Sequence, residues 1–591
     1  MMTSGLLPGP LLIIGAFLVP FFESQHAKRV YLLALPLAAG ISLLSLSPGA
    51  TGSLQFWGYE LQVFRVDKLS MLFGWVFCIM TLLGALFALQ VKDDQQHVAA
   101  MVYAGSTLGV VFAGDFLTLY IFWELMAVSS TFLILATRTR QAKDAGFRYI
   151  LMHIVGGLLL LAGIILSARN GQTLDVAFIG LQGIESWLIF LGFALNAAAV
   201  PLHAWLPDAY PMGTPTSTVF LSAFTTKSAV YLMARCFPGT ELLIWIGAIM
   251  VVGPIIYAIL ENDIRRVLAY SLLNQTGFMF CGIGIGTALA LNGAVAHAFC
   301  CVLYMALLFM ATGTVLDRTG KIKASELGGL YAQMPWTCGF CLIGAASIAA
   351  FPLFSGFVSK SMVISASGYE QLAVVWLLLL VGSAAAVFHA GLKVPYVIFF
   401  GPDSGIRTGE GSWNMLLAMG LTAFLCLFIG IYPSWLYNML PFPVDYVPYT
   451  GAHVLEQLQL LGFGGLVFFL AWRFGYYPAE SPSVNLDVDW VYRKMGDKAY
   501  QLLDWGLNGI NAWSEKGVRG VAAAMGRGVQ VLPLELLMFC AVNIWLLMGV
   551  RGRQLEMKKR MLVHDMSSNT MPIGLGAAIA TLFIFVIYMV T

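Results

Sequence analysis

Four ionisable residues lie inside stretches of the chain that are otherwise apolar enough to cross a membrane. They are Glu124 in GDFLTLYIFWELMAVSS, Lys227 in TTKSAVYLMAR, His297 in GAVAHAFCCVLYM and Lys360 in FPLFSGFVSKSM. A charge at the centre of a span costs about 2.5–3.5 kcal/mol, so such residues point to a function. Carboxylate, ammonium and imidazole groups exchange protons, and imidazole does so near neutral pH. The sequence therefore predicts a path for protons or cations inside a membrane protein.

Three further candidates lie beside prolines. His203 and Asp208 lie in PLHAWLPDAYP, and Lys393 lies in HAGLKVP near the end of a span, where reaching to the interface is its alternative role. A proline break leaves backbone groups that lipid cannot satisfy, so it is tolerated only inside protein or beside a water-filled cavity. A second break, in FPLFSG, directly precedes Lys360. Two broken segments with intramembrane polar groups indicate a transporter built from related repeats.

The composition sets these residues in an all-α, polytopic membrane protein. The 591 residues are 59% hydrophobic and only 10% charged, whereas soluble domains carry about 25% charged residues. The net charge of +2 gives no reason to expect a nucleic-acid partner. Apolar windows predict about 14–17 transmembrane helices. Enzyme motifs are absent, and the lone pair Cys338 and Cys341 is too few ligands for a cluster, so we expect no metal, no cofactor and no catalytic residue.

The chain is expected to divide into six segments. They are N-terminal transmembrane helices (1–95), a first repeat (96–240), a second repeat (241–400), additional transmembrane helices (401–475), an amphipathic interfacial segment (476–532) and C-terminal transmembrane helices (533–591). Residues 476–532 place tryptophans among charges, a pattern typical of a helix lying at the membrane surface. The alternative for this stretch is a solvated linker. Spans are expected near 533–550 and 572–590.

An ordered series of motifs resembles one known family. The motifs are WEL around Glu124, PLHAWLPDAY at 201–210, the lysine of TTKSAVYLMAR, DIRRVLAYS at 263–271, AHAFCCVLYMALLFMATG at 296–313, ELGGL at 326–330 and SGFVSK at 355–360. They are similar to the proton-translocating antiporter-like subunits of respiratory complex I, membrane-bound hydrogenases and Mrp-type Na+/H+ antiporters, and they most resemble the D-type subunits of the Mrp group. The resemblance covers roughly residues 60–400. It implies two inverted five-helix repeats, each with a broken helix, and a chain of Glu, Lys and His residues with water along the membrane midplane.

The resemblance also implies roles for single residues. Glu124 matches a glutamate that pairs with a lysine, Lys227 a lysine that leads toward the centre, His297 a central histidine, and Lys360 the lysine at the exit. Two positions depart from the family pattern, because Asn196 and Met305 stand where lysines are expected. Neither side chain can take up a proton. One interpretation is that water bridges the gap and that Lys227 becomes the partner of Glu124. In a second, the route carries another ion or uses only its second half, and in a third the subunit is a scaffold. We favour altered but retained conduction.

The resulting functional hypothesis is a membrane subunit of a multi-subunit cation/proton antiporter in the inner (plasma) membrane. It would move protons, Na+ or both, beside other membrane subunits in a lipid bilayer, and would not be a catalyst by itself. One alternative is a proton-pumping membrane-arm subunit of a redox complex, of the NADH:quinone oxidoreductase or membrane-bound hydrogenase type. Another is the energising membrane subunit of a complex that accumulates inorganic carbon, where a large cytoplasmic zinc protein would be the partner.

Overall fold

The computed structural model describes residues 7–47, 49, 51–56, 58–477 and 487–568. The chain divides into two compact units, Met1–Asp489 and Trp490–Thr591, and each is described by itself. Almost all of the described chain is helical, as the composition predicts. The predicted span at 572–590 lies outside the described residues. Among the described residues, nine helices are long and apolar enough to cross a membrane.

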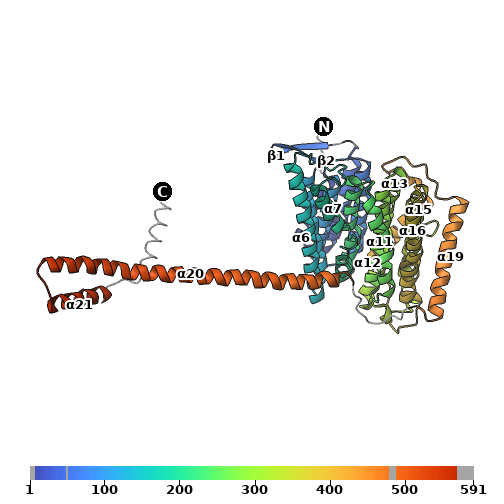
Figure 1. The fold of residues 1–591 in the computed structure, drawn as a ribbon. Coiled ribbons are helices and arrows are strands. Elements are labelled where there is room, and N and C mark those ends of the chain that lie inside the picture. The colour runs from blue at the N-terminus through green and yellow to red at the C-terminus, as the bar shows by residue number, and fades with distance from the viewer. Residues whose placement is uncertain (1–6, 48, 50, 57, 478–486, 569–591) are drawn as a thin grey trace. The chain divides into compact units, whose positions relative to one another are not determined.

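The first unit begins with six helices, of which the first three precede the predicted first repeat and the next three belong to it. Their bounds are α1 Pro8–Ala16, α2 Gln25–Leu44, α3 Lys68–Phe87, α4 Asp94–Phe112, α5 Phe116–Leu135 and α6 Arg140–Arg169. Between α2 and α3 the chain forms an antiparallel hairpin of β1 Thr51–Phe56 and β2 Tyr59–Arg65, which the sequence reasoning did not predict (Figure 1). The hairpin leads directly into the capping residue of α3.

Three pairs of short helices replace continuous spans and form the breaks. Two of the pairs lie in the first predicted broken segment: α7 Ile184–Asn196 with α8 Trp205–Ala209, and α9 Pro215–Ala223 with α10 Thr225–Cys236. The third pair, α14 Pro335–Ile348 with α15 Ser355–Tyr369, lies in the second. The backbone adopts positive φ at Ala198 in the first break, and at Ala350 and Leu353 in the second. Left-handed φ is uncommon for a residue with a Cβ, and such strain is typical of functional segments.

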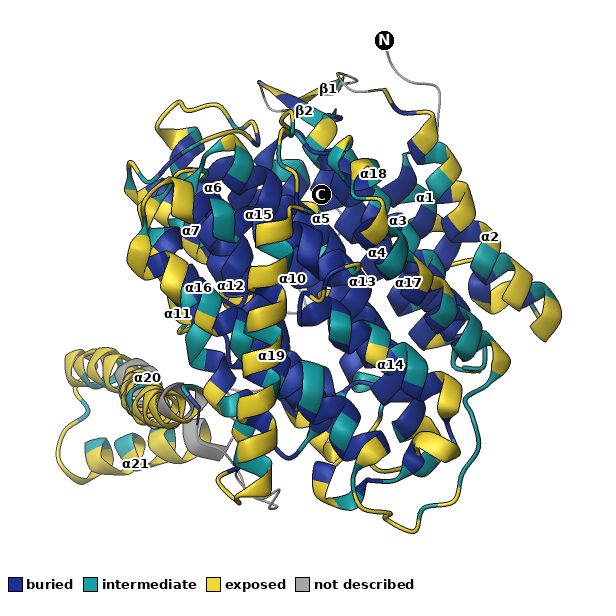
Figure 2. Ribbon diagram, turned by 90° about the vertical axis from the view of Figure 1, so that its right-hand side faces the viewer, coloured by how far each residue is buried: buried dark blue, intermediate teal, exposed yellow. Residues whose placement is uncertain are grey.

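Continuous helices complete the first unit. They are α11 Glu241–Leu260, α12 Ile264–Ile285, α13 Ala288–Thr319, α16 Ala373–Ala386, α17 Trp413–Ile431, α18 Ser434–Tyr437 and α19 Gly451–Arg473, with π-helical stretches at Val387–Lys393 and Tyr396–Phe400. The apolar window of α13 is entirely buried, so this helix runs through the middle of the bundle, and buried helices surround it (Figure 2). Residues carried by α13 are therefore shielded from lipid on every side.

Short polar side chains start most of the long helices. An Asp or Thr at the N-cap accepts a hydrogen bond from a backbone N–H of the first turn in α3 (Asp67), α4 (Asp93), α5 (Asp115), α6 (Thr139), α9 (Thr214), α12 (Asp263) and α13 (Thr287). These groups satisfy donors that a helix leaves unpaired, and each stabilises the structure by about 1 kcal/mol.

The second unit contains α20 Asp489–Leu547 and α21 Arg553–Ser568. Helix α20 has 59 residues, and at 1.5 Å per residue it is roughly 90 Å long. It continues without interruption across the expected segment boundary at 532. Trp505 and Trp513 are 77% and 78% exposed on it. The amphipathic, interfacial character of residues 476–532 stays a prediction.

Asp67 connects three parts of the first unit and supplies a test of the fold. Its carboxylate caps α3, accepts two hydrogen bonds of 2.7 Å from Arg235 at the end of α10, and contacts Arg65 of β2 at 3.1 Å. Burial raises the pKa of Asp67, but the hydrogen bonds and charge of Arg235 outweigh it and hold that pKa well below its usual value. The carboxylate is therefore stabilising at neutral pH.

We expect Asp67→Asn to lower the stability of the purified protein by about 2 kcal/mol at pH 7, because hydrogen bonds to charged groups contribute about 1.5–3 kcal/mol. A carboxylate whose pKa is lower in the folded than in the unfolded protein stabilises the fold at pH values above its unfolded-state pKa, and this contribution is lost as the pH falls. The difference in stability between Asp67→Asn and the wild type should therefore shrink below about pH 4. Thermal unfolding in detergent at several pH values measures this. Asp403→Asn is the matched control, since Asp403 pairs with Arg407 on the surface; equal losses in the two variants would contradict the prediction.

Candidate functional site

Glu124 lies at mid-length of α5, beside a glycine of α6. It is half-buried, and its Oε1 atom is buried without a hydrogen-bond partner among the described residues. A Cβ atom built on Gly157 would lie only 1.8 Å from that oxygen. The carboxylate therefore occupies the space that the missing side chain of Gly157 leaves on α6.

Asn196, the last residue of α7, is fully buried next to a histidine that the sequence reasoning missed. Its Oδ1 lies 2.8 Å from Nδ1 of His153 on α6. The Nδ2 of Asn196 and the Nε2 of His153 are buried with no partner in the described chain. Gly156 of α6 lets α7 come close, because a Cβ atom built on Gly156 would lie 3.4 Å from Oδ1 of Asn196. Polar groups of both neighbouring helices, α5 and α7, therefore meet on one face of α6.

Lys227 follows the α9–α10 break by three residues and is completely buried. Its Nζ donates to Oγ1 of the adjacent Thr226 at 3.2 Å. Within the described residues no carboxylate forms an ion pair with it. Cys301 of α13 also interacts with its ammonium group. A lysine held by a hydroxyl and a thiol, without a permanent counter-ion, has a readily changed protonation state.

His297 lies at the centre of the bundle, on the buried helix α13. Its Nδ1 is 3.1 Å from Oγ of Ser359 on α15, and its Nε2 is 3.2 Å from Oε1 of Gln275 on α12. The hydroxyl of Tyr304 donates to the same Gln275 oxygen at 3.1 Å. Both ring nitrogens are thus in contact with groups that can give or take a proton.

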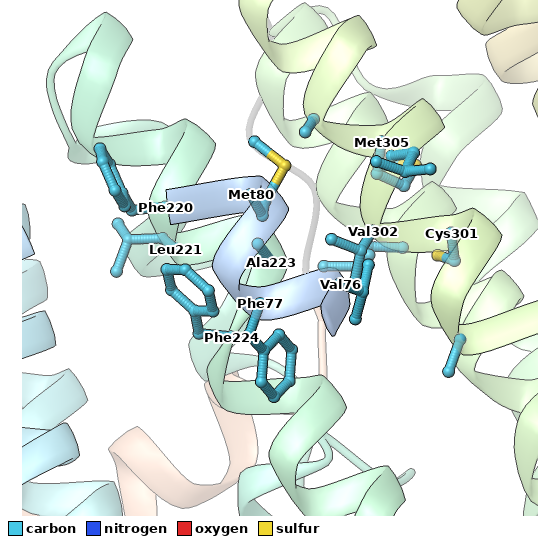
Figure 3. Packing of buried hydrophobic residues seen from close by; sticks show 14 of the residues in the cluster. Val76, Phe77, Met80, Phe220, Leu221, Ala223, Phe224, Cys301, Val302 and Met305 are labelled. Atoms are coloured by element: carbon cyan, nitrogen blue, oxygen red, sulfur yellow. The ribbon is translucent and has the colours of Figure 1, made fainter. Parts of the chain in front are cut away.

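Met305, two turns further along α13, belongs to the apolar core. Figure 3 shows it in the hydrophobic cluster that also contains Val76 and Met80 of α3 and Phe220 of α9. The thioether fills this cluster and offers no site for a proton. Beyond Tyr304, the buried polar side chains of α13 are Thr312 and Thr314, whose hydroxyls donate to backbone carbonyls of the same helix.

Lys360 begins the next part of the site, in the second turn of α15. Its Nζ donates to the carbonyl of Ile348, at the end of α14, at 2.9 Å and lies 4.9 Å from the ring centroid of Phe278. Cationic side chains stabilise helix C-termini, so Lys360 joins the two halves of the broken helix. Electrostatic interactions connect it to His297, which also interacts with Lys227.

A cavity of about 480 Å3 opens beside Lys360, between α15, α16 and α19. Its lining includes Lys360 and Ser361 of α15 and His453, Glu456 and Gln457 of α19. The rest of the lining is mainly apolar and includes Phe357, Trp376 and Phe463. The cavity therefore brings a small group of polar side chains up to Lys360 within an otherwise apolar wall.

Lys393 and His389 extend the row into the π-helical stretch after α16. Lys393 Nζ donates to the carbonyls of Ile259 and Glu261, both at 2.8 Å, and so caps the end of α11. His389, which was not predicted, lies 2.8 Å from Oγ of Ser271 through Nδ1, and electrostatic interactions connect it to both Lys360 and Lys393. π-helical turns inside α-helices are frequent at functional sites.

The structure places His203 and Asp208 away from this row. Asp208 accepts two hydrogen bonds from Arg148 of α6, at 2.7 and 3.0 Å. His203 Nε2 lies 3.4 Å from Oδ1 of Asp487, whose other oxygen accepts a bond of 2.9 Å from Tyr270. Both residues join helices around the first break rather than facing Lys227.

The described residues contain no group of three or more His, Cys, Asp and Glu side chains arranged to hold a metal ion. What they contain instead is an ordered row of buried ionisable groups. In order they are Glu124, His153 with Asn196, Lys227, His297, Lys360, His389 and Lys393. The broken helices and this row thus place ionisable side chains inside a polytopic membrane protein.

Comparisons with known proteins show which family part of the chain is similar to. Residues 113–388 match the family model described as NADH:quinone oxidoreductase/Mrp antiporter, TM. The matched range is a little less than half of the chain, and this similarity agrees with the resemblance predicted from its motifs. The matched range contains Glu124, Lys227, His297 and Lys360.

Two curated relatives are each 27% identical to this chain. Hydrogenase-4 component B of Escherichia coli (strain K12) aligns over 420 residues, 63% of this chain and 62% of that protein. Na(+)/H(+) antiporter subunit A1 of Staphylococcus aureus (strain bovine RF122 / ET3-1) aligns over 520 residues, 78% of this chain and 64% of that protein. The match therefore spans less than two thirds of the length of these relatives.

Two solved structures share the fold at 21% identity. A chain of the Mrp complex from Dietzia sp. DQ12-45-1b gives a TM-score of 0.66, covering 78% of this chain and 98% of that one. A chain of the membrane-bound sulfane sulfur reductase, an archaeal respiratory membrane complex, gives 0.69 and covers 84% and 95%. The all-α polytopic fold is thereby confirmed, and the finer likeness to the D-type subunits of the Mrp group stays a prediction.

Proposed function

We propose that this chain is the proton-translocating membrane subunit of a multi-subunit cation/proton antiporter in the inner (plasma) membrane. The observation that carries the proposal is the buried row from Glu124 to Lys393. Desolvating several ionisable groups is costly, and in a membrane protein such groups mark ion pathways. The relative named as a Na(+)/H(+) antiporter subunit and the similarity to an Mrp complex support the assignment.

Proton movement through the row would use groups that can change their protonation state. Lys227 and Lys360 each have a hydrogen-bond acceptor but no ion-pair partner among the described residues. His297 lies between them in the sequence, and its ring nitrogens contact Ser359, the neighbour of Lys360, and Gln275. Water in the cavity beside Lys360 would exchange the proton with the surroundings. Other membrane subunits would supply the path for Na+ or the energy source.

A redox complex of the hydrogenase or NADH:quinone oxidoreductase type is the second candidate. It is favoured by one relative named as a hydrogenase-4 component and by the fold of the sulfane sulfur reductase chain. An inorganic-carbon complex with a cytoplasmic zinc protein remains the third, and no observation on this structure favours it.

Gentle detergent purification, followed by mass spectrometry of everything that co-purifies, distinguishes the three. The antiporter assignment expects small membrane subunits, and vesicles of the purified complex should show proton movement that depends on Na+ or K+. Co-purification of iron–sulfur or nickel proteins would overturn it in favour of the redox complex. A large zinc protein would overturn it in favour of carbon accumulation.

A further inference from the structure

His153 is a buried histidine with one nitrogen in use and one free of hydrogen bonds. It is 1% exposed, and its ring lies 4.1 Å from that of Tyr149 and 4.7 Å from that of Trp205. Nδ1 lies 2.8 Å from the Oδ1 of Asn196. Because an amide oxygen only accepts, this contact assigns the proton to Nδ1. Nε2 is then a proton acceptor, and it is buried without a partner in the described chain.

The two halves of the first unit place a histidine in corresponding positions. In 96–240 the third helix is α6, and its His153 contacts Asn196 on the broken segment of that half. In 241–400 the third helix is α13, and its His297 contacts Ser359, directly before Lys360, on the other broken segment. Helix α6 packs against α7 as α13 packs against α15. His153 and His297 thus lie on the third helix of their halves and each contacts the broken segment of its half, but only His153 keeps a ring nitrogen without a hydrogen-bond partner in the described chain.

His153 also lies between two other members of the row. Glu124 occupies the space at Gly157, which is one turn further along α6 on the same face. On the other side, Tyr149 lies one turn before His153 and comes close to Thr225, whose hydroxyl is 2.6 Å from that of Tyr103. Thr225 and the Thr226 that holds Lys227 begin α10. Hydroxyl groups thus lead from His153 toward Lys227.

We propose that His153 carries the proton between Glu124 and Lys227, in the half of the row where Asn196 cannot. Nε2 gains a proton through an intervening water as the O–H bond of the Glu124 carboxyl breaks, leaving a carboxylate and an imidazolium. That N–H bond then breaks, and the neutral amine of Lys227 gains the proton through water or the threonine hydroxyls. Asn196 is a positioning residue, since it holds Nδ1 and so keeps Nε2 as the accepting atom.

This inference rests on the proposed function and is tested on the same material, the complex purified with its partners and reconstituted in vesicles with an internal pH dye. His153→Gln keeps a side chain able to bond Asn196 but cannot take up a proton. We expect at least a tenfold lower rate of proton movement. His97→Gln is the matched control, because His97 lies in the first turn of α4, contacts the carbonyl of Val91 through its Nε2 and is outside the row.

The exchange variant His153→Asn with Asn196→His returns an imidazole–amide pair with its members swapped. We expect it to regain at least a tenth of the wild-type rate, whereas His153→Asn alone stays at the level of His153→Gln. A purely structural histidine would give near-normal rates in His153→Gln, and a rate within twofold of wild type overturns the inference. So does an assembled exchange variant that regains nothing. If His153→Gln and Lys360→Met are both fully active, the proposed function and this inference both fail. If His153→Gln is active but Lys360→Met is not, only this inference fails.

Discussion

Replacing Lys360 by methionine is expected to reduce proton movement by the assembled complex about 100-fold, since a positioned proton-transferring side chain contributes about 10²–10⁴-fold. Lys360 is the buried ammonium that lies beside the cavity between α15, α16 and α19. Methionine fills the same volume but carries no proton. The rate is measured in vesicles after an imposed ion gradient, once co-purification shows that the complex has assembled.

A second substitution separates carrying a proton from capping a helix. Lys360→Arg retains a donor for the carbonyl of Ile348, but a guanidinium does not release its proton in proteins. We therefore expect Lys360→Arg to assemble normally and to be inactive. Lys321→Met is the control, because that lysine pairs with Glu326 at the surface. Normal activity in Lys360→Arg would show that Lys360 serves only to hold α14 and α15 together.

The second large effect is expected from Lys227→Met, which should lower the rate at least about tenfold for the same reason. This variant decides what the first half does, since Asn196 and Met305 cannot take up protons. A conducting first half, with Glu124 and Lys227 as the partners, requires the lysine. If protons use only the second half, or if the subunit is a scaffold, Lys227→Met in an assembled complex will match wild type. In either case the rate of proton movement in Glu124→Gln should change in the same direction as the rate in Lys227→Met.

Asn196→Lys examines the same half from the opposite direction. The added ammonium would lie beside His153, whose Nδ1 now contacts the amide. An altered dependence of transport on the imposed gradient is expected if this part of the row is in use. An unchanged rate and dependence would instead agree with a scaffold.

The sequence located the charged members of the row because a charge in a span is rare and costly. Glu124, Lys227 and Lys360 each lie in a span with no other charged residue within a helical turn, so position within the span was enough to identify them. His153 escaped notice for a physical reason. No proline break stands next to it in the sequence, and its contact with Asn196 depends on how α6 packs against α7.

Neighbours in sequence proved a weaker guide at the first break. His203 and Asp208 follow Asn196 closely, and their types suit an ion site. The break turns the chain, however, and Asp208 reaches Arg148 while His203 reaches Asp487. Side-chain direction after a break depends on dihedral angles that residue types do not reveal. Gln275 and Tyr304 were missed because neutral polar residues in spans also serve as ordinary packing residues.

The glycine at 157 has a consequence for how this protein can vary. A Cβ there would lie 1.8 Å from the Glu124 carboxylate, so the two positions share one volume. An alanine at 157 would have to displace the carboxylate, the group with which the row begins. Substitutions at 157 and 124 should therefore be correlated across natural variants: homologues that keep a glutamate at 124 are expected to keep glycine at 157, and those with a shorter residue at 124 are free to lose it.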